Sequence, residues 1–205
     1  MWFATLIIAD MPWSDTIIEQ FECVDSSTKN ETDYYGPYNT LLGDLFLHEA
    51  HFEVTPYFER PIYPGSTGFT ILYIVRRQKC PMLCIQIKPF THLHMHLTRE
   101  KADAQMCERL FSLVDHLVTP KLYGISAMGT CLAIYEYSKE TNLLTPPVIA
   151  PDLECTDVAP ADPWAYELLE EAGEAKVKEL VTSIKAMCAN IACALCLSRS
   201  FLMSF

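Results

Sequence analysis

The chain has 205 residues, half of them hydrophobic and 20% charged, which is enough for one domain with a hydrophobic core. This composition excludes a disordered polymer, a collagen-like repeat and a small disulfide-stabilised protein. The formal net charge of −11 excludes a protein that coats nucleic acid through a globally positive surface. Nine cysteines, an odd number, indicate reduced thiols and an intracellular protein, in the cytoplasm or the nucleus.

Two apolar runs, residues 1–9 and 186–197, are shorter than the roughly 20 residues that a membrane helix needs. No basic residue precedes the first run, as it would in a secretion signal. We therefore expect no membrane insertion. The expected organisation is a peripheral segment over residues 1–33, a single domain over 34–197 and an apolar tail over 198–205.

The N-terminal third predicts two helices separated by a connector. Ser14 precedes Ile17, Ile18 and Phe21, which share one face of a short helix. Residues 23–33 are polar without apolar periodicity, so we expect an exposed connector. Proline suits the first helical position, so the next helix is expected to begin at Gly36-Pro37. Its apolar residues have helical spacing: Tyr38, Leu41, Leu42, Leu45 and Phe46.

Strand signals follow. Residues 52–57 begin a strand, and residues 69–77 and 82–88 are rich in the β-branched and aromatic residues that favour sheets. A short turn joins the last two strands, which predicts an antiparallel hairpin buried on both faces. In the loop that follows, His92, His94 and His96 alternate, so an extended chain would present them on one side. Three imidazoles in this arrangement are a second candidate metal site, for Zn²⁺.

The C-terminal half predicts a long helix capped by Thr98, strands at 122–127 and 131–137, and a proline-rich acidic connector over 143–162. A helical region over 164–171 is expected to break at Gly173, before a final helix over 174–196. The element order α-β-β-β-α-β indicates an α/β fold. We expect a mixed central sheet with extra C-terminal helices.

One strand carries a motif with chemical meaning. Strand alternation places Gln86 and Lys88 on one side of the sheet, at the end of the predicted hairpin. With the element order, this strand resembles the (D/E)-x-K strand of the PD-(D/E)xK, or restriction-endonuclease-like, nuclease superfamily. The resemblance implies Mg²⁺-dependent hydrolysis of phosphodiesters, in which acidic side chains hold the ion and the lysine positions the attacking water.

The chain is also similar to a family of uncharacterised fungal proteins with this nuclease-like core. The resemblance extends over about four fifths of the chain, and its matching stretches are DYYGPYN at 33–39, FTI at 69–71, IKPF at 87–90, KADAQM at 101–106, PKLYGISA at 120–127 and KAMCA at 185–189. The resemblance implies a restriction-endonuclease-like core from Tyr34 to about Tyr137.

The departures from the family pattern bear on activity. Thr67-Gly68 stands where the family has an Asp, and Gln86 stands where it has a Glu. The resemblance then implies Lys88 and Gln86 as catalytic residues, with Mg²⁺ held by Glu49, Gln86 and the backbone carbonyl of Ile87. The two missing acids remove about two negative charges from a site for a doubly charged cation, which predicts a degenerate site.

Three functions stay open at this point. The first is a metal-dependent phosphodiesterase acting on DNA or RNA. The second is a non-catalytic pseudo-nuclease or protein-interaction module, and the third is an accessory to a kinase-like protein. A locally basic stretch predicts nucleic acid as a partner: Arg76, Arg77, Lys79, Lys88, Arg99 and Lys101. Alternatively, Lys88 is simply a solvated strand terminus, or the partner of a helix carboxylate.

Overall fold

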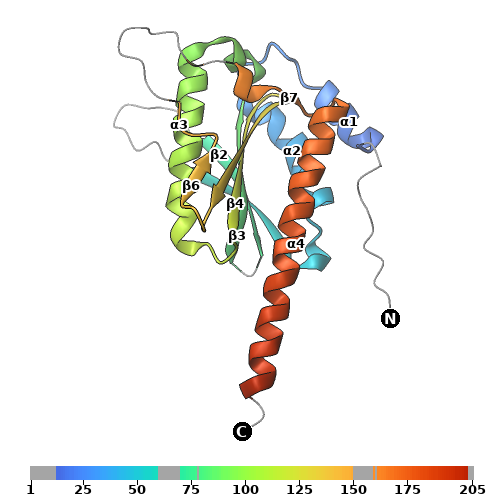
Figure 1. The fold of residues 1–205 in the computed structure, drawn as a ribbon. Coiled ribbons are helices and arrows are strands. Elements are labelled where there is room, and N and C mark those ends of the chain that lie inside the picture. Colours follow the sequence, from blue (N-terminus) through green and yellow to red (C-terminus); the bar gives the residue numbers. More distant parts are fainter. Residues whose placement is uncertain (1–12, 60–69, 78, 150–158, 160, 203–205) are drawn as a thin grey trace.

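The computed structural model describes residues 13–59, 70–77, 79–149, 159 and 161–202 (Figure 1). Its strands are β1 (Phe52–Glu59), β2 (Thr70–Arg77), β3 (Cys80–Lys88), β4 (Lys121–Met128), β5 (Cys131–Ser138), β6 (Leu143–Thr145) and β7 (Tyr166–Glu167). Its α-helices are α1 (Asp15–Glu22), α2 (Tyr35–Leu45), α3 (His96–Leu113) and α4 (Glu171–Leu202). Short 3-10 helices are η1 (Glu31–Tyr34), η2 (His48–Ala50), η3 (Phe90–His94), η4 (Val114–His116) and η5 (Asp162–Trp164).

The strands form one open, mixed sheet in the order β1-β2-β3-β4-β5-β6, with β7 paired to β5. β1, β2 and β3 are an antiparallel meander, and β4 and β5 are an antiparallel hairpin. β3 and β4 are parallel, because α3 carries the chain back across the sheet between them. The predicted α/β class with a mixed central sheet is confirmed.

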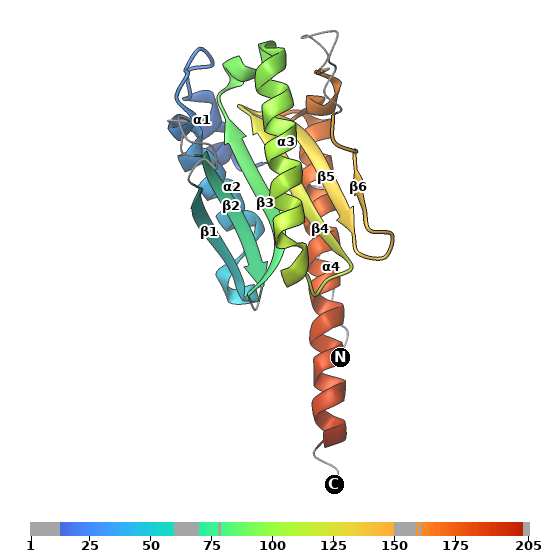
Figure 2. The same cartoon turned by 90° about the vertical axis from the view of Figure 1, so that its left-hand side faces the viewer.

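Helices cover both faces of the sheet. α3 lies on one face, and α2 and α4 lie on the other (Figure 2). Successive residues of β3 alternate between the two cores: Leu83 and Ile85 pack with the side chains of α2 and α4, and Cys84 packs with those of α3. The expectation that this strand is buried on both faces is therefore confirmed.

The N-terminal segment is less peripheral than predicted. Trp13, Ile17 and Phe21 are buried in the core beneath α2 and α4. The indole Nε1 of Trp13 donates a hydrogen bond to the carbonyl oxygen of Leu168 at 2.8 Å. These aromatic contacts make residues 13–22 part of the domain, so the boundary predicted at residue 33 does not divide the packing.

The C-terminal region departs from the prediction in two places. η5 and β7 replace the helix expected over 164–171, and α4 runs through Gly173 instead of starting after it. A Cβ atom at position 173 would lie 1.9 Å from the carbonyl oxygen of Glu167. Gly173 therefore permits a close approach of α4 to the chain around the end of β7. From the sequence alone, the same glycine indicates a helix break.

The far end of α4 contains part of the predicted tail. Residues 198–202 continue the helix, which projects beyond the sheet (Figure 1), and residues 203–205 lie outside the described part. In the part of the chain that the structure describes, no helix has an apolar stretch long enough to cross a membrane.

Two buried charged side chains on α3 fix the backbone on both sides of residues 150–158. Arg99 donates from Nε and Nη2 to the carbonyl oxygen of Ala159, at 2.9 and 2.6 Å. One turn further, Asp103 accepts from the backbone N–H of Ile149 at 2.8 Å and from the hydroxyl of Tyr135 at 2.9 Å. Burial raises the pKa of the Asp103 carboxyl.

The start of α3 also differs from the prediction. The helix begins at His96, so Thr98 lies inside it. The Thr98 hydroxyl donates to the carbonyl oxygens of His92 and Met95, at 2.5 and 2.7 Å, and does not cap a backbone N–H. A hydroxyl can satisfy either kind of backbone group, and the sequence alone does not distinguish them.

Candidate functional site

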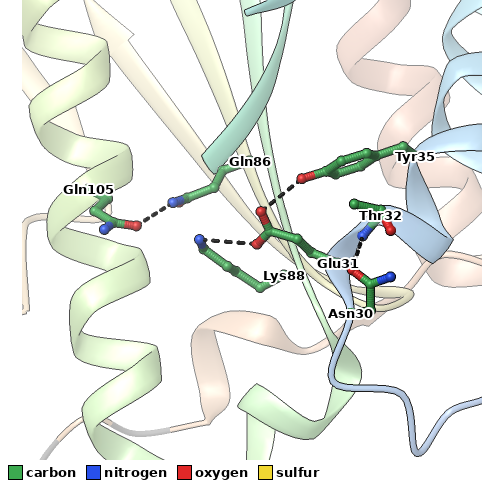
Figure 3. A network of polar contacts seen from close by, with 7 residues as sticks. All are labelled: Asn30, Glu31, Thr32, Tyr35, Gln86, Lys88 and Gln105. Atoms are coloured by element: carbon green, nitrogen blue, oxygen red, sulfur yellow. Dashed lines mark hydrogen bonds and ion pairs between the residues drawn. The ribbon is translucent and has the colours of Figure 1, made fainter. Parts of the chain in front are cut away.

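The candidate site lies at the carboxyl end of β3, a central strand. Gln86 is only 1% exposed and lies between Leu72 of β2 and Ser126 of β4. Its Nε2 donates to Oε1 of Gln105 on α3 at 2.6 Å (Figure 3). Strand alternation places Lys88 on the same face, where its side chain is 14% exposed.

The end of β3 is fixed by the turn between β4 and β5. The backbone N–H of Gly129 donates to the carbonyl oxygen of Lys88 at 2.8 Å. Gly129 has a φ of 62°, in the left-handed region that glycine adopts readily. Tyr38 of α2 in turn donates from its hydroxyl to the carbonyl oxygen of Gly129 at 2.7 Å. The backbone that presents Lys88 is therefore held from both sides.

Lys88 forms an ion pair with a carboxylate that the sequence did not assign to the site. Its Nζ lies 3.4 Å from Oε2 of Glu31, whose side chain is 19% exposed. The other oxygen, Oε1, accepts from the hydroxyl of Tyr35 at 2.8 Å, so the carboxylate is held at both oxygens (Figure 3). The expectation that residues 23–33 form an exposed connector is wrong at Glu31.

A local signal for Glu31 is present in the sequence. The side chain of Asn30 accepts a hydrogen bond from the backbone N–H of Thr32 at 3.3 Å and caps the short helix η1. An Asn followed by acidic residues just before Gly36-Pro37 is a pattern typical of a helix start. η1 leads directly into α2, and this turn of chain carries Glu31 to the end of β3.

One atom of the site has no hydrogen-bond partner. Oε1 of Gln86 is inaccessible to solvent, and no donor reaches it among the residues that the structure describes. A buried acceptor left unpaired costs about 1–3 kcal/mol, so such atoms are rare in folded proteins. Near the end of β3, Gln86 therefore has a buried amide oxygen whose hydrogen-bonding capacity is not used by the described residues.

The three alternating histidines do not face one side, because they lie in and after η3 instead of on an extended chain. The rings of His94 and Phe90 are in edge-to-face contact, and His96 Nδ1 lies 3.2 Å from the carbonyl oxygen of Ala159. His92 lies nearest the site: burial and the positive charge of Lys88 lower its pKa, against a raising effect of Glu31. Within the described ranges, no cluster of three or more His, Cys, Asp or Glu side chains is placed to hold a metal ion.

The structure does not bring Glu49 to the other predicted site residues. Glu49 lies in η2, just before β1, and the register pairs Phe52 with Arg77 and Arg77 with Cys80. Glu49 is thus near the beginning of β3, whereas Lys88 is at its end, about 26 Å away along a nine-residue strand. The predicted ligand set of Glu49, Gln86 and Ile87 does not converge, and the carboxylate that pairs with Lys88 among the described residues is that of Glu31.

The other two predicted ligands are adjacent at the end of β3. The Ile87 side chain is fully buried and faces the core formed with α2 and α4, so only its backbone carbonyl could serve as a ligand. Gly68, where the family pattern has an acid, lies outside the described residues.

The predicted basic stretch does not form one surface. Arg76, Arg77 and Lys79 lie at the turn between β2 and β3, at the opposite end of β3 from Lys88. Arg77 donates from Nη1 to the carbonyl oxygen of Cys188 on α4 at 2.8 Å. Arg99 is buried and holds Ala159, so it is not available to phosphate groups.

Among the described residues, the side chains at the end of β3 supply few of the oxygen ligands that Mg²⁺ prefers. Mg²⁺ requires several oxygen ligands in a strict geometry and is bound in proteins mainly through carboxylates. Among the described residues in contact with Lys88 or Gln86, Glu31 supplies a carboxylate, and Gln86 supplies a neutral amide oxygen. Within the described part of the chain, the pair of Glu31 and Lys88 carries no net charge.

No family model, curated protein or solved structure matches the chain. We therefore base the functional proposal on the order of the elements and on the contacts of Glu31, Gln86 and Lys88.

Proposed function

We propose that the chain is a restriction-endonuclease-like domain, related to the PD-(D/E)xK superfamily and to the fungal family named above, that works as a non-catalytic pseudo-nuclease. Two features support the relationship. The elements α2, β1, β2, β3, α3 and β4 follow one another in the order α-β-β-β-α-β. The Gln86-Ile87-Lys88 motif stands at the end of the third strand of that series, beside the long helix.

The single observation that carries the lack of catalysis is the way the polar groups of the site contact one another. Lys88 is paired with Glu31, and Nε2 of Gln86 donates to Gln105, so the ammonium and the amide N–H are engaged with neighbouring side chains. Metal-assisted hydrolysis needs an ion that neutralises phosphate charge and supplies hydroxide near neutral pH. Among the described residues, Glu31 is the carboxylate that contacts Lys88, and this pair carries no net charge with which to attract that ion.

A binding role fits what the site retains. The fold keeps its central strand, whose end is held through the buried hydrogen bond of Tyr38 to Gly129, and its ion pair, which is held by the part-buried hydrogen bond of Tyr35 to Glu31. The function would then be to present a surface to another macromolecule, with a protein partner favoured over nucleic acid, because the basic side chains are dispersed and partly buried.

The test is a cleavage assay on the full chain. Purified wild-type protein and Lys88→Met are incubated with plasmid, single-stranded DNA and RNA, in Mg²⁺ or Mn²⁺. We expect no cleavage by either protein. Equal cleavage by both would come from a contaminating nuclease. Cleavage by the wild type that depends on the divalent ion and is lost in Lys88→Met would overturn the non-catalytic function and establish a phosphodiesterase.

A further inference from the structure

We propose that the sulfur atoms of Met82 and Cys188 form a binding site for one Cu(I) ion, between the beginning of β3 and α4. The two residues are 106 positions apart in the chain, yet Sγ of Cys188 lies 3.8 Å from Sδ of Met82. The site is at the opposite end of β3 from Lys88, so the inference does not depend on the proposed function.

A β-bulge directs the Met82 side chain toward α4. Val75 of β2 lies opposite Leu83, and the next residue of β2 lies opposite Pro81, so the register leaves Met82 without a partner on β2. Met82 shares a core with its neighbour Leu83, whereas regular alternation would place the two on opposite faces of the sheet. An extra residue in a strand re-aims a side chain in this way. The distortion of β3 therefore brings the thioether to α4.

The two sulfur atoms are of the kinds that select a soft ion. Thiolate and thioether ligands favour Cu(I) over hard ions such as Mg²⁺. A thiolate sulfur lies about 2.3 Å from a bound zinc ion, so two sulfur ligands of one ion of similar size are at most about 4.6 Å apart. The observed 3.8 Å is within this limit. The flexible methionine side chain can make the small adjustment that opens the angle at the ion.

The charge balance of the site favours a monovalent ion. Met82 and Cys188 are each only 2% exposed, so added charge is costly there. Burial raises the pKa of the Cys188 thiol, which outweighs the lowering effect of Arg77, and Cys80 raises it further. The protonated thiol donates to Sδ of Met82. Binding breaks the S–H bond, forms an S–Cu bond and releases one proton to solvent, so the charge of the site is unchanged.

Cys80 belongs to the same core, but its sulfur has other contacts. It accepts the backbone N–H of Val118 at 3.2 Å and donates to the carbonyl oxygen of His116 at 3.5 Å. We therefore assign a single thiol to the site. The two residues that follow Cys188 on α4 are exposed, which places the sulfur pair close to solvent and gives an ion a short route of entry.

The experiment measures the Cu(I) affinity of the full chain by competition with the chromophoric chelator bicinchoninate, without oxygen and with a reductant. Thiols that are exposed or whose side chains lie outside the described part are first replaced, to give a parent protein with Cys23→Ser, Cys155→Ser, Cys193→Ser and Cys196→Ser. We expect the parent to bind one Cu(I) ion. Cys188→Ser and Met82→Leu should each lower the affinity about tenfold or more, because each removes one of the two soft ligands. Because one proton is displaced, the affinity should rise about tenfold for each pH unit below the thiol pKa.

Met106→Leu and Cys107→Ser are matched controls, because these neighbours on α3 are also buried but face the other core. Both should keep the affinity of the parent. Met82→Leu conserves apolar volume, so it tests the site even if Cys188→Ser does not fold, and circular dichroism checks the folding of each variant. Four results would overturn the proposal: no binding by the parent, an unchanged affinity in folded Met82→Leu, equal losses in the controls, or a rise of about 100-fold for each pH unit, which would require two thiols.

Discussion

Replacing Gly173 by alanine tests whether the junction between β7 and α4 is as tight as described. The added Cβ would lie 1.9 Å from the carbonyl oxygen of Glu167, 2.5 Å from its carbonyl carbon and 3.1 Å from the backbone nitrogen of Leu168. All three are backbone atoms, so no flexible side chain can move away. The first turn of α4 must shift by more than about 1 Å to restore van der Waals contact.

The size of the effect follows from opposing contributions. Glycine to alanine inside a helix normally stabilises by about 1 kcal/mol. Overpacking against a rigid neighbour costs about 3 kcal/mol. The shift also strains the chain at Leu168, whose backbone N–H donates to Thr130 and whose carbonyl oxygen accepts from Trp13. Weakening these hydrogen bonds adds about 1 kcal/mol to the loss of stability. We expect a net loss of about 3 kcal/mol.

Equilibrium urea unfolding measures this loss directly. Gly36→Ala and Gly43→Ala in α2 are matched controls. A Cβ at either position would have no atom within 4 Å other than those of its chain neighbours and its own helix backbone. These variants should be unchanged or stabilised by up to about 1 kcal/mol. A Gly173→Ala variant as stable as the controls would refute the close approach between α4 and the chain after β7.

Three further substitutions test the core and the polar contacts. Tyr38→Phe removes the hydroxyl that donates to Gly129 and should cost about 1–2 kcal/mol in urea unfolding; no loss would mean that water replaces this bond. Leu110→Ala removes a fully buried side chain under the sheet and should cost about 3 kcal/mol, with a lower Tm in calorimetry; a change under about 1 kcal/mol would contradict its burial. The pKa of Asp103 in the folded state lies above its ordinary value of 3.8, so on acidification the folded state binds this proton before the unfolded state does. The contribution of Asp103 to stability therefore rises as the pH falls through the folded-state pKa. Asp103→Asn should remove this rise, and identical pH dependences of the unfolding free energy in both proteins would contradict it.

Local patterns in the sequence predicted the elements on which the site stands. The helical spacing of Tyr38, Leu41 and Leu42 marked α2, and all three side chains are buried. Strand alternation correctly grouped Gln86 with Lys88, because the period of two is a property of the backbone. From the sequence, Gly173 indicates a helix break, since nothing in the sequence shows that another stretch of backbone passes within contact distance of it.

The missing part of the site depends on contacts between distant parts of the chain. Glu31 lies 57 residues before Lys88, in a polar stretch that looks like any exposed connector. Glu49 looked more suitable because it follows a helix and precedes the strands. Proximity along the chain does not say at which end of the sheet a residue lies, however. η2 lies near the beginning of β3, whereas Lys88 is at its end.

The attachment of Ile149 and Ala159 to α3 makes the stretch between them a natural place to open or extend the chain. Both attachments are made by buried side chains of one rigid helix, so they do not depend on the covalent link between residues 150 and 158. Lengthening the covalent connection between two fixed points of a chain costs little, about 0.6 kcal/mol for each doubling. An inserted reporter domain should therefore leave the sheet intact, and two fragments divided there should reassemble, since β7 and α4 in the second fragment still have β5 and the core to pack against.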